Sequence, residues 1–234
     1  AVATFFNGSN FIVDKASLTS VGSPVISRWA NASAGLDALL DPWNLMLGLA
    51  VMFLARILGT LYIINNVEDE AIRTRGRRQL LVNTVPFLAF FLAFFIRTLL
   101  KDGYAVNAET GMIFMEPMKY LHNYLALWPT AVLTLVGVLL LLYGIVRSLL
   151  HSAYTKGIWP AGIGVVLVVL CLFLCAGLND TAFYPSNADL QSSLTIQNSC
   201  SSEFTLQSMA IVSVLVPFVF GYIAYVWRVM DRKK

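Results

Sequence analysis

Apolar residues along this chain gather into five long stretches, and polar residues gather between them. Each stretch is about 20 residues long, the length that an α-helix needs to cross the ~30 Å hydrocarbon core of a bilayer. The predicted spans are residues 44–66, 80–100, 126–149, 158–178 and 208–228. The pattern therefore predicts an all-α fold, a polytopic transmembrane helix bundle with five spans in this chain.

The chain divides into an N-terminal region, 1–43, and a five-helix transmembrane region, 44–234. The N-terminal region opens with AVATFF, which is typical of the last turns of an apolar helix, and continues as the extramembrane segment 7–43. We therefore expect the sequence to be the C-terminal portion of a longer protein. Asp41 and Pro42 indicate the start of the first span, because Asp caps helices and Pro is tolerated in their first turn.

Two prolines lie well inside predicted spans, Pro86 in the second and Pro217 in the fifth. A proline in a helix removes one backbone hydrogen bond and clashes with the preceding turn, so we expect a kink at each position. Most of the tryptophans lie at span ends, as in the aromatic belts of membrane proteins. They are Trp43, Trp128, Trp159 and Trp227.

Lysine and arginine are distributed unevenly between the two sides that five alternating spans define. One side holds ten of them, in loop 67–79, in and beside loop 150–157, and in the C-terminal tail. The other side holds four, in segments 7–43, 101–125 and 179–207. Because short cytoplasmic loops carry the excess of Lys and Arg, the first side is predicted to be cytoplasmic and the second periplasmic.

Composition agrees with a membrane protein and excludes an ordinary soluble domain. Hydrophobic residues make up 58% of the chain and charged residues 12%, whereas soluble domains average about 25% charged residues. The net charge is only +3, and the basic loops are those that membrane topology already explains. We therefore expect no nucleic-acid partner, and the sequence also lacks a phosphate-binding glycine loop or a Ser-His-Asp set.

Few residues suggest a metal or haem site. His122 and His151 flank the third span at opposite membrane faces, and no second ligand pairs with either. We interpret both as polar interface residues. Three methionines recur in the 101–125 segment and could bind Cu(I), but without a Cys or His beside them we interpret them as packing residues. They are Met112, Met115 and Met118.

Arg56 is the sharpest candidate for a functional residue. It lies near the middle of the first span, where a charge costs ~2.5–3.5 kcal/mol on insertion scales. No Asp or Glu lies in any predicted span, so its partner is expected outside this chain or in a polar, lipid-like ligand. Arg97, near the end of its span, is interpreted as an interfacial anchor, and Asn83 and Thr84 are expected to hydrogen-bond between helices.

A hydroxyl-rich segment, SLTIQNSCSSEFTLQSM, separates the last two spans. Ser202 or Thr205 is expected to cap the last helix by accepting a backbone N–H. Glu203 would complement the positive end of the helix dipole. We therefore predict that these three residues form a structural cap rather than a catalytic site.

The most distinctive motifs also lie in this region. Pro185-Ser186, Ser193-Leu194-Thr195 and the element SSxxTLxxM of residues 201–209 precede the last span, which ends in YVWRVMDRKK. This order resembles the C-terminal signature of subunit II of cytochrome bd-type quinol oxidases. NGSNFIVDK and LLDPWNLMLGL, near the start of the chain, resemble an external segment of the same family. The resemblance therefore covers nearly the whole chain, without the family's N-terminal helices.

The resemblance implies a role in a respiratory complex of the bacterial cytoplasmic (inner) membrane. The complex oxidises quinol and reduces oxygen to water, and haem b and haem d belong to the partner, subunit I. Subunit II is the haem-free partner of that subunit, and some members hold a structural quinone. We therefore expect this chain to carry no catalytic residues, and Arg56 to contact a quinone or lipid. Small accessory membrane subunits are further expected partners.

Two alternatives remain open at this point. The chain could belong to a transporter or channel, with Arg56 lining a substrate path through proline-interrupted spans. It could also be a membrane anchor or assembly scaffold with no role in turnover. Composition alone does not separate these hypotheses.

Overall fold

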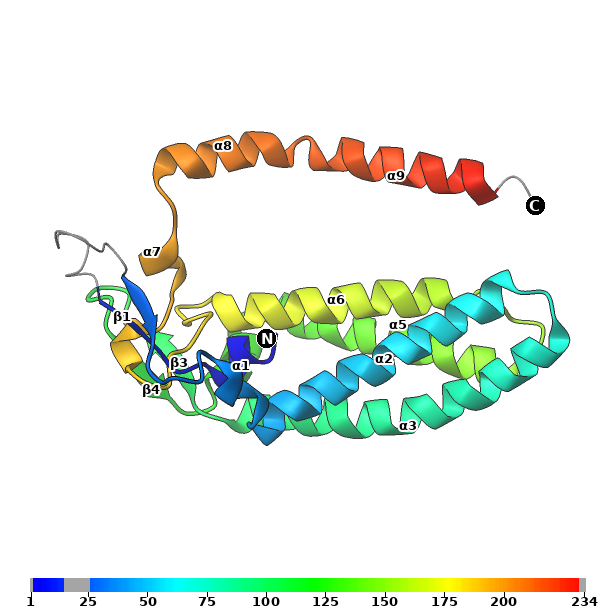
Figure 1. Ribbon diagram of the computed structural model, residues 1–234, viewed down its shortest axis with the longest axis horizontal. Coiled ribbons are helices and arrows are strands. Elements are labelled where there is room, and N and C mark those ends of the chain that lie inside the picture. The colour runs from blue at the N-terminus through cyan, green and yellow to red at the C-terminus, as the bar shows by residue number, and fades with distance from the viewer. Residues whose placement is uncertain (1, 15–25, 232–234) are drawn as a thin grey trace. The chain divides into compact units, whose positions relative to one another are not determined.

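The computed structural model describes residues 2–14 and 26–231 (Figure 1). The chain forms two compact units, Ala1–Ile196 and Gln197–Lys234, and each is described by itself. Some cations used above to predict the topology lie outside the described residues. They are Lys15, Arg232, Lys233 and Lys234.

The first unit is built on a bundle of four long helices (Figure 1). These are α2 (Pro42–Asn66), α3 (Glu70–Leu100), α5 (Trp128–Leu150) and α6 (Ile158–Gly177). α2 packs mainly on α3 and α5 mainly on α6, because short connections bring sequential helices side by side. The centre of the bundle is aliphatic, with Ile57, Leu61, Leu80, Ile145 and Ala161 almost fully buried.

The number of spans is confirmed for the described residues, in which five helical stretches, the last from Glu203 to Met230, are long and apolar enough to cross a membrane. The loop predicted over residues 67–79 is wrong, because α3 already begins at Glu70. Asp69 caps α3 by accepting the Ile72 N–H at 2.9 Å, and the arginines that follow are good helix formers. Hydropathy detects where a helix enters the membrane, and this helix continues for several turns beyond that point.

The two prolines inside the predicted spans have different outcomes. α3 runs through Pro86 without interruption. The last span, in contrast, consists of two helices, α8 (Glu203–Ser213) and α9 (Val216–Asp231), with Pro217 in the first turn of α9. In a continuous helix the Pro217 ring would collide with the backbone carbonyl of Ser213, four residues earlier. α8 ends at Ser213, so the proline accounts for this break.

The predicted bridges of Asn83 and Thr84 between helices are wrong. The Asn83 side chain donates to the Gln79 carbonyl at 2.7 Å, and the Thr84 hydroxyl donates to the Leu80 carbonyl at 2.7 Å. Both acceptors lie one turn earlier in α3, and both side chains are buried. A hydroxyl or amide in an apolar environment commonly takes the nearest carbonyl of its own helix when no polar neighbour faces it.

A polar layer covers one end of the four-helix bundle (Figure 1). Two antiparallel hairpins, β1–β2 and β3–β4, form its sheets, so short strands add to the predicted all-helical architecture. Its elements are α1 (Thr4–Asn7), β1 (Phe11–Val13), β2 (Ser27–Trp29), η2 (Leu36–Leu39), β3 (Gly103–Val106), β4 (Ile113–Glu116), α4 (Lys119–Ala126) and η3 (Leu190–Ser192). A further short helix, α7 (Ile196–Ser199), lies at the boundary of the two units.

Three segments that are far apart in sequence are hydrogen-bonded together in this polar layer. The Ser9 N–H donates to the Pro185 carbonyl at 3.1 Å, and the Ala182 N–H donates to the Tyr104 carbonyl at 2.9 Å. The side chain of Gln191 also pairs with both backbone groups of Ile113. The alternation of spans predicted that these three segments share one end of the bundle, and the structure brings them together.

Glycines of α5 and α6 let these two helices approach closely. A Cβ added to Gly137 would lie 2.8 Å from the Gly164 carbonyl oxygen and 2.9 Å from Val168. A Cβ on Gly164 would in turn collide with the Gly137 carbonyl oxygen. Small residues let helix backbones approach in membranes, where helices gain little from hydrophobic burial against lipid.

Substituting Gly164 with alanine is therefore expected to destabilise the α5–α6 pair by about 1–3 kcal/mol through overpacking. The matched control is Gly162→Ala in the same helix, because nothing lies within 4 Å of a Cβ at Gly162. Thermal unfolding in mild detergent compares the two. Equal midpoints for both variants would show that the contact does not limit stability.

Candidate functional site

Arg56 is exposed on α2, whereas Ile57 and Leu61 of the same helix are buried. Its backbone carbonyl accepts a hydrogen bond from Thr60 at 2.7 Å. Among the described residues, no ion pair or side-chain hydrogen bond engages its guanidinium. Within the described part of the first unit, Arg56 therefore has no polar side-chain partner.

A cavity of about 720 Å³ lies at one end of the same helix face. Gly48 and Asn44 of α2 line it together with Thr4, Ser9 and Tyr184 of the polar layer. The hydroxyls of Ser9 and Tyr184 are 2.8 Å apart, so at least one of them donates to the other. Arg56 does not line the cavity, since it lies eight residues, or about 12 Å of helix, beyond Gly48.

Arg97 reaches from the end of α3 into the polar layer, as expected of an interfacial anchor. Its guanidinium donates to the Asn7 side chain at 3.0 Å and stacks over Trp43, 4.5 Å from the ring centroid. Asn7 is bonded in turn to Asn44 at 2.7 Å. The contact joins the start of α2 to the end of α3.

Lys101, one turn beyond Arg97, is largely buried at the same place. Its ammonium donates to the Phe6 carbonyl and lies 5.6 Å from the Tyr120 ring centroid. Burial, and then the Arg97 charge nearby, lower the pKa of Lys101 to about 8. Lys101 therefore begins to lose its charge just above neutral pH.

Asn123 of α4 forms a buried polar hub under the polar layer. Its amide donates to the Cys175 carbonyl at 2.8 Å and to the Thr181 hydroxyl at 2.7 Å, and its oxygen accepts from Asn179 at 2.9 Å. The side chain is fully buried. These bonds hold α4 against the end of α6 and the chain that follows it. The hub was missed from sequence, although the polar and apolar spacing of KYLHNYLA could have revealed a short amphipathic helix.

The two histidines do not share a site. His122 of α4 lies 2.8 Å from Glu116, which also pairs with Lys119 at 3.0 Å. The hydrogen bond from His122, supported by Lys119, lowers the pKa of Glu116 below its usual value. His151 follows the far end of α5, whose 23 residues extend about 35 Å. Residues 2–14 and 26–231 contain no group of three or more His, Cys, Asp or Glu that could hold a metal ion.

The three methionines interpreted as packing residues are partly exposed in this chain. They lie on and around β4 with substantial exposure, from 42% to 60%. The β3–β4 hairpin is a single layer of two strands, so the side chains on its outer face have no second sheet to pack against. They are Met112, Met115 and Met118.

Ser202 directly precedes α8. Its hydroxyl accepts the Thr205 N–H at 3.5 Å and lies 3.0 Å from the Thr205 hydroxyl. Glu203 is in the first turn and accepts from the Gln207 side chain at 3.2 Å. The earlier part of the hydroxyl-rich segment belongs to the first unit, where Ser193 is buried and its hydroxyl accepts the Ser186 N–H at 2.9 Å.

Comparison with known proteins gives the family. The sequence model for cytochrome bd terminal oxidase subunit II matches residues 1–230. The chain belongs to the cytochrome bd terminal oxidase subunit II family. It is 28% identical over 211 residues to cytochrome bd-I ubiquinol oxidase subunit 2 of Escherichia coli K12, and equally to that of strain O157:H7. The alignment covers 83% of this chain and 53% of the relative, so the chain spans about half the length of the curated relatives it matches.

For this subunit II chain, Asn123→Leu is expected to lower the free energy of unfolding. It leaves the buried Cys175 carbonyl without its partner, at about 1–3 kcal/mol, and also removes the donor to the buried Thr181 hydroxyl. Thermal unfolding of the purified protein measures the loss. Asn66→Leu is the control, because Asn66 is exposed and its side chain donates to the Tyr62 carbonyl of its own helix. An equally small effect of both substitutions would contradict the role of the hub.

Proposed function

We propose that this chain is the haem-free subunit II of a cytochrome bd-type oxidase, which oxidises quinol and reduces oxygen to water. The observation that carries the proposal is the family match over residues 1–230. The relatives it matches are named as ubiquinol oxidase subunits. The family match does not favour the transporter or channel alternative.

The haems are proposed to lie in the partner, subunit I, with haem b and haem d both bound there. His122 and His151 of this chain do not fit an axial pair on one haem, because they lie beyond opposite ends of α5, which is about 35 Å long. The contribution of this chain is then to support the haem-bearing subunit. Small accessory membrane subunits are additional proposed partners.

We also propose that the complex lies in the bacterial inner membrane with the polar layer on the periplasmic side. Support comes from the opposite end of the bundle, where Arg77 of α3 donates to the Ser148 carbonyl at 3.1 Å. The two basic turns predicted to be cytoplasmic therefore lie close together. Their excess of Lys and Arg agrees with the positive-inside rule, by which basic residues gather in cytoplasmic loops.

Arg56 is proposed to contact a polar group outside this chain, such as a structural quinone, a lipid headgroup or a helix of a partner. Its exposed position in the middle of α2 supports this, because a charge facing only acyl chains would be costly. At the start of α8, Ser202, Glu203 and Thr205 are proposed to form a helix cap that contributes stability and no chemistry.

Deleting this chain from cells that produce the complex is expected to abolish the haem absorbance of the purified oxidase and its oxygen consumption. Visible spectra and an oxygen electrode measure both. Unchanged spectra with altered solute uptake would support a transporter. If both the haem spectra and the oxygen consumption are unchanged, the chain is a membrane anchor or scaffold with no role in turnover.

Replacing Arg56 with methionine tests this proposal, because the sign of the change in thermal stability depends on whether the guanidinium has a polar partner. If the guanidinium has a polar partner, Arg56→Met lowers the thermal stability of the complex in nanodiscs, and Arg56→Lys restores part of it. If it faces acyl chains alone, the same substitution stabilises the complex by up to ~2.5–3.5 kcal/mol, the insertion cost of the charge. Quinone extracted per complex shows whether quinone is that partner. The charge-matched control is Arg75→Gln, since Arg75 is exposed in the basic first turns of α3.

A further inference from the structure

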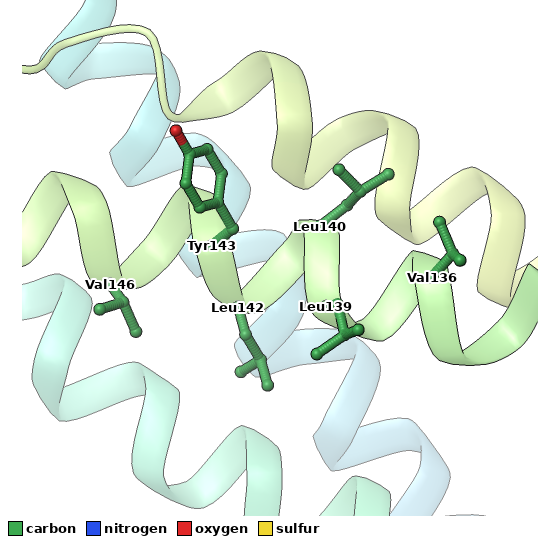
Figure 2. A pocket seen from close by; sticks show the side chains of 6 residues that line it. All are labelled: Val136, Leu139, Leu140, Leu142, Tyr143 and Val146. Atoms are coloured by element: carbon green, nitrogen blue, oxygen red, sulfur yellow. The ribbon is translucent and has the colours of Figure 1, made fainter.

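The outward face of α5 carries two adjoining shallow grooves. The first, about 550 Å³, is lined by aliphatic side chains and one tyrosine (Figure 2). The second, about 340 Å³, shares Tyr143 and Val146 with the first and ends at Arg147 and His151. The first groove is lined by Val136, Leu139, Leu140, Leu142, Tyr143 and Val146. The two grooves therefore form one continuous surface that is apolar along most of its length and polar at one end.

The length of the apolar part matches one leaflet of a bilayer. From Val136 to Val146 the helix rises about 15 Å, which is half of the ~30 Å hydrocarbon core. Leu139, Tyr143 and Val146 are each about half exposed along this stretch. Arg147 follows within the last turn of α5, which ends at Leu150, so the polar end lies where the helix leaves the hydrocarbon.

Arg147 is held in a fixed position by aromatic side chains. Its guanidinium donates to the Tyr143 hydroxyl at 2.5 Å and lies 5.5 Å from the Tyr143 ring centroid and 4.9 Å from that of Tyr154. Within the described residues no carboxylate forms an ion pair with it. Most of its N–H donors are thus available at the mouth of the groove, beside the exposed His151.

A helix C-terminus carries a partial negative charge, which by itself would disfavour an anion here. Arg77 of α3 offsets this effect. Its guanidinium donates to the Ser148 carbonyl at 3.1 Å and to the Ser152 carbonyl. It therefore satisfies carbonyls at and just beyond the end of α5 and adds a second positive charge at this end of the helix.

We infer that this surface is a binding site for an anionic glycerophospholipid. One acyl chain lies along Val136, Leu139 and Val146, and the phosphate accepts hydrogen bonds from Arg147 and His151. Basic residues at the mouth of an apolar groove are a recurrent way in which membrane proteins select anionic headgroups. No carboxylate lines either groove, so a choline headgroup has no counter-charge there. The inference requires only that α5 spans the bilayer and does not depend on the proposed oxidase function or sidedness.

The test uses the purified complex that contains this chain, stripped of lipid and titrated with dioleoyl phosphatidylglycerol or dioleoyl phosphatidylcholine. Native mass spectrometry measures the bound lipid. Phosphatidylglycerol is expected to bind tighter than phosphatidylcholine, and Arg147→Gln is expected to weaken it about tenfold, the size of one lost charge-assisted hydrogen bond. Arg75→Gln is the control, because it removes the same charge from the nearby α3 segment without lining a groove.

Leu139→Trp keeps Arg147 and fills the apolar groove, so it is expected to reduce phosphatidylglycerol binding by itself. Inorganic phosphate is expected not to compete at millimolar concentration, because it lacks the acyl chain. Equal binding by Arg147→Gln and Arg75→Gln, or no preference between the two lipids, would overturn the inference. If Arg147→Gln does not assemble, unchanged binding by Leu139→Trp overturns it.

Discussion

The four-helix bundle depends on the direct approach of two helix backbones, α5 and α6, at Gly137 and Gly164. Each glycine has the carbonyl oxygen of the other where a Cβ would otherwise lie. In a bilayer the helices are already surrounded by apolar groups, so close packing replaces hydrophobic burial as the main attraction. The other pair, α2 and α3, packs through large side chains instead. These include the stacked rings of Phe53 and Phe90, whose centroids are 6.1 Å apart. The closely packed pair α5–α6 and the pair α2–α3 with its large side chains together enclose the aliphatic centre of the bundle.

Three cations of the first unit follow one rule, and Arg56 departs from it. Arg97, Lys101 and Arg147 lie at helix ends, and each is held by an oxygen atom and an aromatic ring. Such contacts place the charge at the edge of the hydrocarbon and the alkyl stem within it. Arg56 is the exception, because it lies in the middle of its helix and has no such contact within the described chain. This contrast makes Arg56 informative about what surrounds the chain.

Several expectations failed for a common reason. The apolar periodicity of α3 does not extend over its first ten residues, yet Asp69 and the arginine-rich turns continue the helix into water. Asn83 and Thr84 are polar and buried, but the sequence does not tell whether a neighbouring helix offers an acceptor. Asn123 binds partners that are more than 50 residues away. A single-sequence pattern reports the local preference of a segment and not which distant groups it meets.

The class, the number of spans, the cap at Asp41 and the family could be predicted from the sequence, because each depends on local composition or on the order of motifs along the chain. The sequence also identified Arg56 as unusual, since the cost of a charge in hydrocarbon does not depend on the fold. Only the tertiary structure decided the close contact of Gly137 with Gly164, the hub at Asn123 and the continuous groove that ends at Arg147. These features arise from the register in which helices pack and from loops that meet across the chain. Their energies depend on distances between residues that the linear sequence does not contain.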